Sequence, residues 1–341
     1  MRASLFSVLA LVLVACGGES PPPRAPEPAP PVQTAPPPPA VAPPPPPPTT
    51  TQAQLSPPID EKAVAAATGV EKPESSGGVV KASFPRKDVD VRVDGWKMPP
   101  FMGLTSWAAF TPGKSGVAEA MVMGDLVLFE DEVNPVMSAL LDGGVQVTAL
   151  HNHFSFDQPH VYFMHIGGEG TVDALGKGVK AAMDEVARIR KKTPKPPATS
   201  GAPALPAKNT IDGAKLEAAF GMKGTSKDGM FKLVVGRETQ ASCGCTVGKA
   251  MGVNTWAAFA GSDDAAVVDG DFSVAESELQ SVLKELRAGG INVVAIHHHM
   301  SGESPRLLFL HYWGRGKAAD LAAVVKRALD KTAYEGKTTT S

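Results

Sequence analysis

The chain contains an internal duplication, and this limits the folds that it can adopt. The run "GDLVLFEDEVNPVMSALLDGG" at residues 124–144 aligns without a gap with "GDFSVAESELQSVLKELRAGG" at residues 270–290, and "SWAAF" at 106–110 matches "TWAAF" at 255–259. From Gly124 onward the second copy follows the first by a constant 146 residues. Two unrelated segments would not keep this register, so the chain carries two copies of one folding unit.

The copies are separated by a short proline-rich stretch. The locally basic run "RIRKKTPKPP" leads into it, and proline-rich segments are typical of linkers. We therefore predict homologous domains at residues 59–190 and 209–334, each with the length of an ordinary domain, joined by a linker at 191–208 and followed by a tail at 335–341.

Each copy has the same order of helical and strand-like patterns. In the second copy a short helix, with Thr210 or Asp212 as its cap, precedes three β-rich runs. Next, "AESELQSVLKELRAGG" spaces its leucines as a helix does and ends at a glycine pair. Two strands, "INVVAIHHH" and "RLLFLHYW", and a last helix complete the unit. This order predicts an α+β fold, with an antiparallel sheet that carries helices on one face, but it leaves the strand order open.

The start of the chain has the features of a bacterial lipoprotein signal. Arg2 precedes an apolar run too short to span a bilayer, and Leu13-Val14-Ala15-Cys16 matches a lipobox. We predict that residues 1–16 form the signal peptide and that lipidated Cys16 attaches the protein to a membrane. Gly17 favours the periplasmic side of the outer membrane in the cell envelope. The alternative is an ordinary secretory signal with an incidental cysteine.

Residues 17–58 are predicted to form a proline-rich tether. The stretch from 21 to 58 holds 19 of the 32 prolines, which favours extended polyproline structure and excludes a packed core. At about 3.1 Å per residue this stretch would reach at most roughly 100 Å. A disordered leader without mechanical function is the alternative.

The charge of the chain gives no indication of a nucleic acid partner. The formal net charge is −2, and no long run of lysine and arginine is present. No ligand or protein partner can be named from the composition.

Histidines recur at matching positions in the two copies. "VQVTALHNHF" carries two histidines at alternate positions, "INVVAIHHHM" carries the equivalent pair, and the following strand of each copy adds one more. Alternate residues of a strand share a face about 6.6 Å apart, and a hairpin neighbour lies roughly 5 Å away. Each hairpin should therefore gather three imidazoles, which are His151, His153 and His165 in the first copy and His297, His299 and His311 in the second.

Three imidazoles are the ligand set of a tetrahedral zinc site or a copper site with one position left open. We therefore predict that these six histidines bind zinc or another divalent transition metal. The alternative is that they are core residues that hydrogen bond between strands. His298 should face the other side of the sheet, and His160 corresponds to Arg306, so neither belongs to the shared pattern.

Carboxylates also recur at matching positions. Asp125 and Asp271 follow a glycine within an apolar run, and either one could complete a metal site, orient a ligand histidine, or act as a catalytic base on a bound water. Glu132 and Glu278 open a helix, where a negative charge complements the helix dipole, and we assign them that role.

The second copy alone contains a Cys-x-Cys motif. Cys243 and Cys245 could form a small disulfide ring, remain thiols, or bind a metal together, and the spacing does not choose among these.

The long motifs resemble a known family. The runs "GDLVLFEDEVNPVMSALLDGGVQVTALHNH", "VYFMHI" and "INVVAIHHHMSGESPRLLFLHYWGRG" are similar to the LppY/LpqO family of bacterial lipoproteins and secreted proteins, over nearly all of residues 59–334. The resemblance implies a duplicated domain and a lipoprotein, but no substrate and no catalytic residue, because the family has no characterised function. The first copy has "FDQPH" where the second has "GESPR", so the two sites need not be equivalent.

Three classes of function remain compatible with the sequence. A membrane-anchored protein with a duplicated ligand-binding domain needs only the histidine clusters and the tether, and this is the function that we predict. A metal-dependent hydrolase acting on an envelope substrate is the second, although no nucleophile motif, phosphate loop or dinucleotide fingerprint is present. A structural lipoprotein that docks a partner is the third.

Overall fold

The computed structural model describes residues 54–337. The predicted signal peptide, Cys16, nearly all of the tether and the last residues of the tail therefore lie outside the described residues. Over residues 54–337, no helix combines the length and the apolar composition needed to cross a membrane.

The first repeat consists of three helices, six longer or edge strands, and a small accessory sheet. Its main elements are α1 (Glu61–Thr68), β1 (Glu74–Ser76), β2 (Val79–Pro85), β5 (Thr105–Pro112), β6 (Ala120–Phe129), α2 (Glu130–Asp142), β7 (Gln146–His151), β9 (Val161–Gly170) and α3 (Val172–Lys192). The accessory sheet contains β3 (Arg92–Val93), β4 (Trp96–Lys97) and β8 (Asp157–Gln158), and a 3-10 turn, η1 (Pro100–Met102), follows β4.

The second repeat follows the same order. Its main elements are α4 (Gly213–Phe220), β10 (Thr225–Lys227), β11 (Met230–Gly236), β14 (Asn254–Gly261), β15 (Ala266–Ala275), α5 (Glu276–Ala288), β16 (Asn292–His297), β17 (Leu307–Gly316) and α6 (Ala318–Leu329). A hairpin of β12 (Thr239–Gln240) and β13 (Thr246–Val247) and the turn η2 (Lys249–Met251) complete it.

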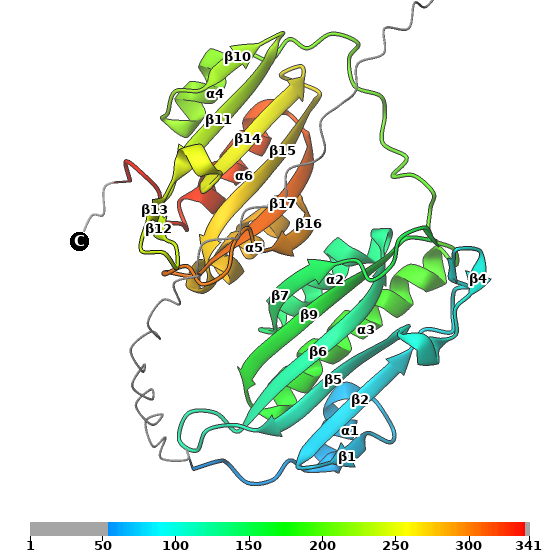
Figure 1. Ribbon diagram of the computed structural model, residues 1–341. Coiled ribbons are helices and arrows are strands. Elements are labelled where there is room, and N and C mark those ends of the chain that lie inside the picture. The colour runs from blue at the N-terminus through cyan, green and yellow to red at the C-terminus, as the bar shows by residue number, and fades with distance from the viewer. Residues whose placement is uncertain (1–53, 338–341) are drawn as a thin grey trace, which may run out of the picture. The chain divides into compact units, whose positions relative to one another are not determined.

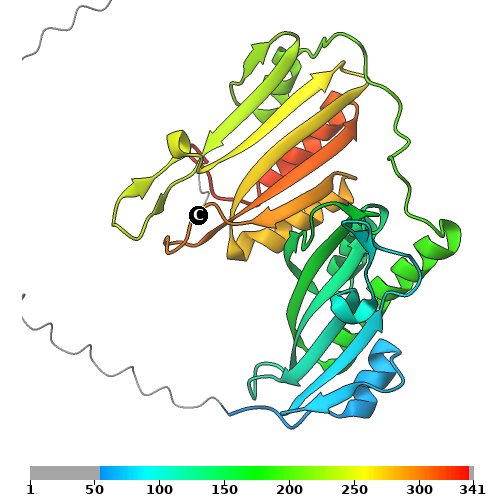
Figure 2. The same cartoon turned by 45° about the vertical axis from the view of Figure 1, so that its right-hand side comes forward.

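The predicted α+β fold is confirmed. Every pair of neighbouring strands is antiparallel, in the order β1-β2-β5-β6-β9-β7 in the first repeat and β10-β11-β14-β15-β17-β16 in the second. The helices of each repeat lie on one side of its strands (Figures 1 and 2). The sequence could not fix this order, because the last strand of each repeat inserts between two earlier ones.

Local signals in the sequence account for most element boundaries. Helix α5 buries Leu279, Leu283 and other apolar residues at three and four spacing and ends just before Gly289. Asp212 caps α4 by accepting from the backbone N–H groups of Ala214 and Lys215, so the predicted cap is Asp212 and not Thr210. Helix α3 ends at Lys192, slightly past the predicted end of the first domain.

The strands carry two different faces. In β6 the side chains of Leu126 and Leu128 pack with the helices in the main core, whereas Val127 and Phe129 point to the other side. On that other side the apolar residues form only a small separate cluster, with Phe163 and residues around β3 and β4. The second repeat has an equivalent small cluster that includes Leu307 and Phe309. The rest of this second face is free for polar side chains.

The two repeats join edge to edge in a single sheet of 12 strands. Leu150 of β7 pairs with Ile296 of β16, and these two residues occupy the same position in their repeats. The contact is therefore a pseudo-twofold one, in which each repeat offers the same edge to the other.

Side chains of α2 and α5 extend this contact in the same symmetric way. The amide group of Asn134 donates to Val293 O and accepts from Val293 N, at 3.1 Å and 2.8 Å. Gln280 stands at the matching position and does the same with Val147, at 2.8 Å and 3.1 Å. Each amide side chain thus hydrogen bonds to a strand-edge N–H and C=O group in the way that a neighbouring strand would.

We predict that Asn134→Ala and Gln280→Ala each lower the free energy of unfolding by about 1–2 kcal/mol, because each leaves a backbone N–H and C=O without a partner. Urea unfolding followed by circular dichroism measures this loss. Gln146→Ala, on an exposed position of β7, is the control and should change stability by less than about 0.5 kcal/mol. Equal effects of the three substitutions would contradict the role assigned to the two amides.

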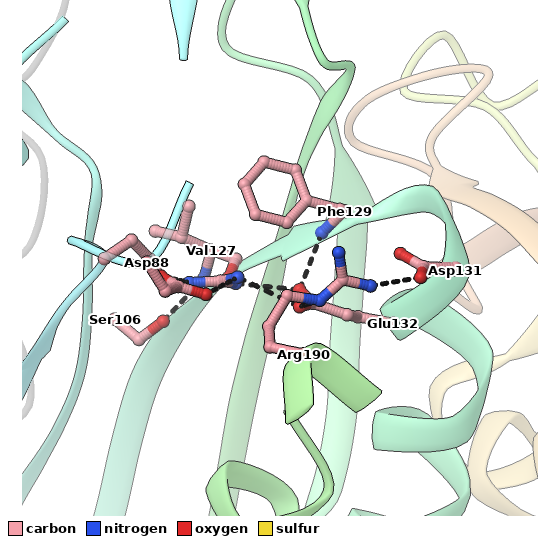
Figure 3. Close-up of polar contacts among 8 residues, drawn as sticks. Asp88, Ser106, Val127, Phe129, Asp131, Glu132 and Arg190 are labelled. Carbon is pink, nitrogen blue, oxygen red and sulfur yellow. Dashed lines mark hydrogen bonds and ion pairs between the residues drawn. The ribbon is translucent and has the colours of Figure 1, made fainter. Parts of the chain in front are cut away.

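A buried ion-pair network fixes the start of α2 in the first repeat (Figure 3). Glu132 is fully buried, accepts from Phe129 N at 2.9 Å, and binds both terminal nitrogens of Arg86 at 2.7 Å and 2.9 Å. Arg190 Nε, from α3, lies 2.8 Å from Glu132 Oε1, and Arg190 also pairs with Asp131. Glu132 does lie in the first helical turn, as predicted, but its main partners are these two arginines.

The second repeat has a similar ion pair with one arginine in place of two. Glu278 caps α5 by accepting from Ala275 N and binds one arginine, Arg237, at 2.5 Å. Its carboxylate is partly exposed, and Ala333 N is its other backbone donor.

Replacing Glu132 with Ala should therefore cost more than replacing Glu278 with Ala. The first change leaves two buried guanidinium groups without their shared carboxylate, for which we expect a loss of about 3–5 kcal/mol. The second should cost roughly 1–3 kcal/mol, because Arg237 can be hydrated more easily. Denaturant unfolding of the two variants side by side measures the difference, and equal losses would contradict it.

Candidate functional site

Three histidines and one aspartate meet on the second face of the first repeat's sheet. Asp125 of β6 is the direct cross-strand partner of His165 in β9. An irregularity in β7 brings Ala149 opposite His165, and His151 follows at the end of the strand. The rings of His151 and His165 stack with their centroids 5.0 Å apart. The predicted cluster is thus present, with the aspartate beside it.

The predicted geometry of His153 was wrong. Strand β7 ends at His151, so His153 belongs to the following connection and does not continue the alternation of the strand. The chain turns so that His153 Nε2 lies 3.2 Å from His151 Nε2, and the ring of His153 stacks on Phe163 at 3.4 Å between centroids. The centroids of the two rings are 5.1 Å apart.

The second repeat reproduces this geometry. His299 Nε2 lies 3.1 Å from His297 Nε2, and His299 stacks on Phe309 at 3.5 Å. The rings of His297 and His311 stack at 5.0 Å, as in the first repeat. The stacking phenylalanine and the third histidine are also the same in the two copies, so the paired imidazoles are a property of the shared motif.

A buried carboxylate borders each cluster. Asp125 is 9% exposed and Asp271 is 4% exposed. Among the described residues, the Oδ1 atom of each is buried and has no hydrogen-bond partner. Asp271 Oδ2 lies 3.7 Å from His299 Nε2. Buried polar atoms are nearly always paired in folded proteins, so an orphaned carboxylate oxygen in both copies points to a missing partner at this place.

Burial shifts the titration of both kinds of group toward their neutral forms. It raises the pKa of Asp125, and it raises the pKa of Asp271 to about 6. It lowers the pKa of His151 and His153 and of their counterparts His297 and His299. These imidazoles are therefore neutral near pH 7, and a neutral imidazole is the form that ligates a metal.

The spacing of the paired nitrogens fits two ligands of one metal ion. Two nitrogens at about 2.0–2.1 Å from a tetrahedral zinc ion are roughly 3.3–3.4 Å apart. The observed 3.2 Å and 3.1 Å are close to this value. The same distance also suits an N–H···N hydrogen bond between neutral rings.

The third imidazole of each cluster does not converge with the other two. His165 stacks on His151, and its Nδ1 atom lies 3.4 Å from Gly124 O. Within residues 54–337, no group of three or more histidine, cysteine, aspartate or glutamate side chains has an arrangement that could already hold a metal ion. The structure thus supplies two spaced nitrogens and a nearby carboxylate, and a third ligand would need a side-chain rotation.

Two residues that sequence reasoning missed hold the connections that carry His153 and His299. Asp157 is buried and accepts from Val161 N at 2.6 Å, and Glu303, its counterpart, accepts from Leu307 N at 3.0 Å. The constant offset of 146 residues could have revealed this pair. His160 Nδ1 lies 3.0 Å from Asp157 Oδ1, apart from the cluster.

The stacking partners were also missed. Phe163 and Phe309 stand two residues before His165 and His311, on the same face of their strands. Arg86, by contrast, lies 46 residues from Glu132 in sequence, and no local pattern relates the two. His298 is exposed after the end of β16 and does not join the cluster, as expected.

Cys243 and Cys245 form a disulfide with each other. Of the three alternatives that the sequence left open, the structure contains the small ring.

We predict that Asp271→Asn stabilises the metal-free protein at high pH. The folded state holds a proton on Asp271 up to about pH 6, whereas an unfolded chain releases it near 3.8. The stability that this proton contributes is present below pH 4 and is lost as the pH rises through 6. The variant should be more stable by about 1–3 kcal/mol at pH 8 and equal to the native protein near pH 4.

Thermal or urea unfolding in the presence of a chelator, from pH 4 to pH 8, checks this expectation. Asp264→Asn, an exposed residue in the turn between β14 and β15, is the control and should stay within about 0.5 kcal/mol of the native protein at both ends of this range. A constant difference between Asp271→Asn and the native protein across this range would contradict burial as the cause.

A family model described as "Domain of Unknown Function (DUF1259)" matches residues 62–185 and again residues 214–331, which confirms the duplicated domain. No curated protein sequence gives a significant match. The crystal structure of a trimeric bacterial microcompartment shell protein, PduB, is similar over 76% of this chain and 90% of that chain, at 13% sequence identity and a TM-score of 0.20. A TM-score of 0.20 does not indicate a shared fold.

Proposed function

We propose that each repeat of this chain, which belongs to the family described as "Domain of Unknown Function (DUF1259)", binds one divalent transition metal ion. Zinc is the first candidate. The protein is then a binding module with two related sites and not primarily an enzyme.

The observation that carries this proposal is the repeated pair of Nε2 atoms. In both copies a neutral imidazole pair stands at 3.2 Å and 3.1 Å, close to the separation of two ligands on one ion. An orphaned carboxylate oxygen borders each pair. A cation would give that oxygen a partner and would offset the cost of burying it.

The residues divide into two roles in this proposal. His151 and His153, and likewise His297 and His299, supply the first two ligands. Asp125 or Asp271 is placed to supply the third, or to orient a bound water. His165 and His311 stack on the rings of His151 and His297 and limit the rotation of these two ligands.

A hydrolase that uses the same ion is the second candidate. The observation that favours it is the pKa of Asp271 near 6, which suits a general base near neutral pH. In that case turnover of a panel of esters or glycans should be lost in His297→Ala. Metal binding without any turnover would leave the binding module as the function.

We also propose that the protein is a lipoprotein of the cell envelope, lipidated at Cys16 and tethered by residues 17–58. This part rests on the sequence of residues 1–58 and on the resemblance to the LppY/LpqO family. A tethered binding module would hold its ion or ligand close to the membrane surface. A structural lipoprotein that docks a partner remains the alternative if no metal binds.

Elemental analysis of the full chain, purified without a histidine tag and dialysed against zinc, tests the metal sites. We expect two metal ions per chain in the native protein and one in each double variant, His151→Ala/His153→Ala and His297→Ala/His299→Ala, because each pair supplies the first two ligands of one site.

His160→Ala and His298→Ala are the matched controls and should keep both ions, because these side chains lie outside the clusters. Circular dichroism checks that every variant is folded. Native protein without metal, or double variants that keep the full amount, would rule out these sites.

A further inference from the structure

The disulfide of the second repeat lies at the tip of an exposed hairpin. Cys243 and Cys245 are both exposed, and Gly244 between them adopts a left-handed conformation with φ of +78°. Backbone hydrogen bonds from Ala241 N to Cys245 O and from Gly244 N to Ala241 O close the turn at 2.9 Å and 2.8 Å. In Figure 2 this yellow-green hairpin extends past the ends of the long strands. An external thiol therefore has direct access to both sulfurs.

The first repeat shows that the hairpin does not need cysteines to form. Its counterpart, β3 and β4, closes through the two-residue turn Asp94-Gly95, in which both residues have positive φ. That hairpin docks on β8 through Arg92 and Gln158. In the second repeat Gln240 docks on Ser304, which matches Gln158, with hydrogen bonds of 3.1 Å and 2.9 Å. One docking geometry is thus built with and without a disulfide.

The disulfide is also a weak device for stabilising the chain. A disulfide stabilises mainly by restricting the unfolded chain, and the effect shrinks as the closed loop shortens. Cys243 and Cys245 are two positions apart, so the loop is very short. Neither hairpin closure nor global stability explains why this repeat carries the pair.

The docking contacts of the hairpin lie away from the sulfurs. Besides the Gln240 and Ser304 pair, Thr239 Oγ1 donates to Pro305 O at 2.9 Å. Val247 packs in a small cluster with Leu307 and Phe309. None of these contacts involves the side chains of Cys243 or Cys245, so opening the disulfide leaves them in place.

We propose that Cys243 and Cys245 form a reversible thiol–disulfide exchange site whose reaction partner is a dithiol. A thiolate of the partner attacks one cysteine sulfur, the S–S bond breaks, and its electron pair leaves on the other sulfur, which takes up a proton. The partner's second thiolate then attacks the partner's first sulfur in the mixed disulfide. This breaks the bond to the cysteine of this chain, and that cysteine leaves as a thiolate and takes up a proton. The dithiol is oxidised to a disulfide, and the Cys243–Cys245 pair gains two electrons and two protons.

The test uses the full chain with Cys16→Ser, so that this pair holds the remaining cysteines of the chain. The folded protein is treated with dithiothreitol, and free thiols are counted with a coloured disulfide reagent while circular dichroism follows the fold. We expect two thiols per chain to appear with no change in the spectrum, and oxidised glutathione to restore the disulfide. Thiols that appear only in denaturant, or reduction that unfolds the chain, would overturn the proposal.

Two further arms identify the partner and separate exchange from a structural role. Reduction by thioredoxin but not by reduced glutathione would support a protein dithiol, whereas reduction by both would support exchange with small thiols as well. The single variants Cys243→Ser and Cys245→Ser should each trap a mixed disulfide with glutathione, since the second sulfur that resolves it is missing. Cys243→Ser/Cys245→Ser should release no thiols and keep the melting temperature. A large fall in that temperature would show that the disulfide serves to stabilise the fold, and would overturn the proposal.

Discussion

Alternate residues of each strand face opposite sides of the sheet, and the helices of each repeat cover only one of these sides. In β6, Leu126 and Leu128 pack with the helices, while Asp125 and Val127 point away from them. This single fact decides where polar chemistry can occur. The helix side must be apolar to hold the fold together, so buried charge on that side would be costly. The other side is only partly covered, and it tolerates imidazoles and a carboxylate next to a small apolar cluster.

The duplication gives an internal comparison that separates what the fold requires from what one copy has added. The paired imidazoles, the aromatic ring under one of them, the neighbouring aspartate and the carboxylate that holds the connection occur in both repeats. The buried network around Glu132 has two arginines in the first copy and one in the second. The disulfide occurs in the second copy only. Features present twice belong to the common site, and features present once belong to the individual repeat.

The pKa shifts in each cluster support the proposed cation sites. Burial lowers the pKa of the paired histidines and raises that of the aspartate, so above about pH 6 the metal-free site of the second repeat combines neutral imidazoles with a buried, negatively charged carboxylate that has one oxygen without a partner. Such an arrangement costs stability when it is empty, and functional sites commonly carry costs of this kind.

Local patterns in the sequence determined the duplication, the α+β class, the helix boundaries at Asp212 and Gly289, and the histidines and aspartates that share a face. Each of these depends on residues a few positions apart, where helix and strand periodicity act directly. Only the tertiary structure decided three other features. Strand β7 ends at His151, and the Nε2 atom of His153 lies 3.2 Å from that of His151. Strands β7 and β16 meet edge to edge, and Arg86 binds Glu132. The physical reason is the same for all three. A backbone turn after a strand, an unpaired strand edge and a buried charge are each satisfied by whichever partner the folded chain brings near, and that partner can be distant in sequence.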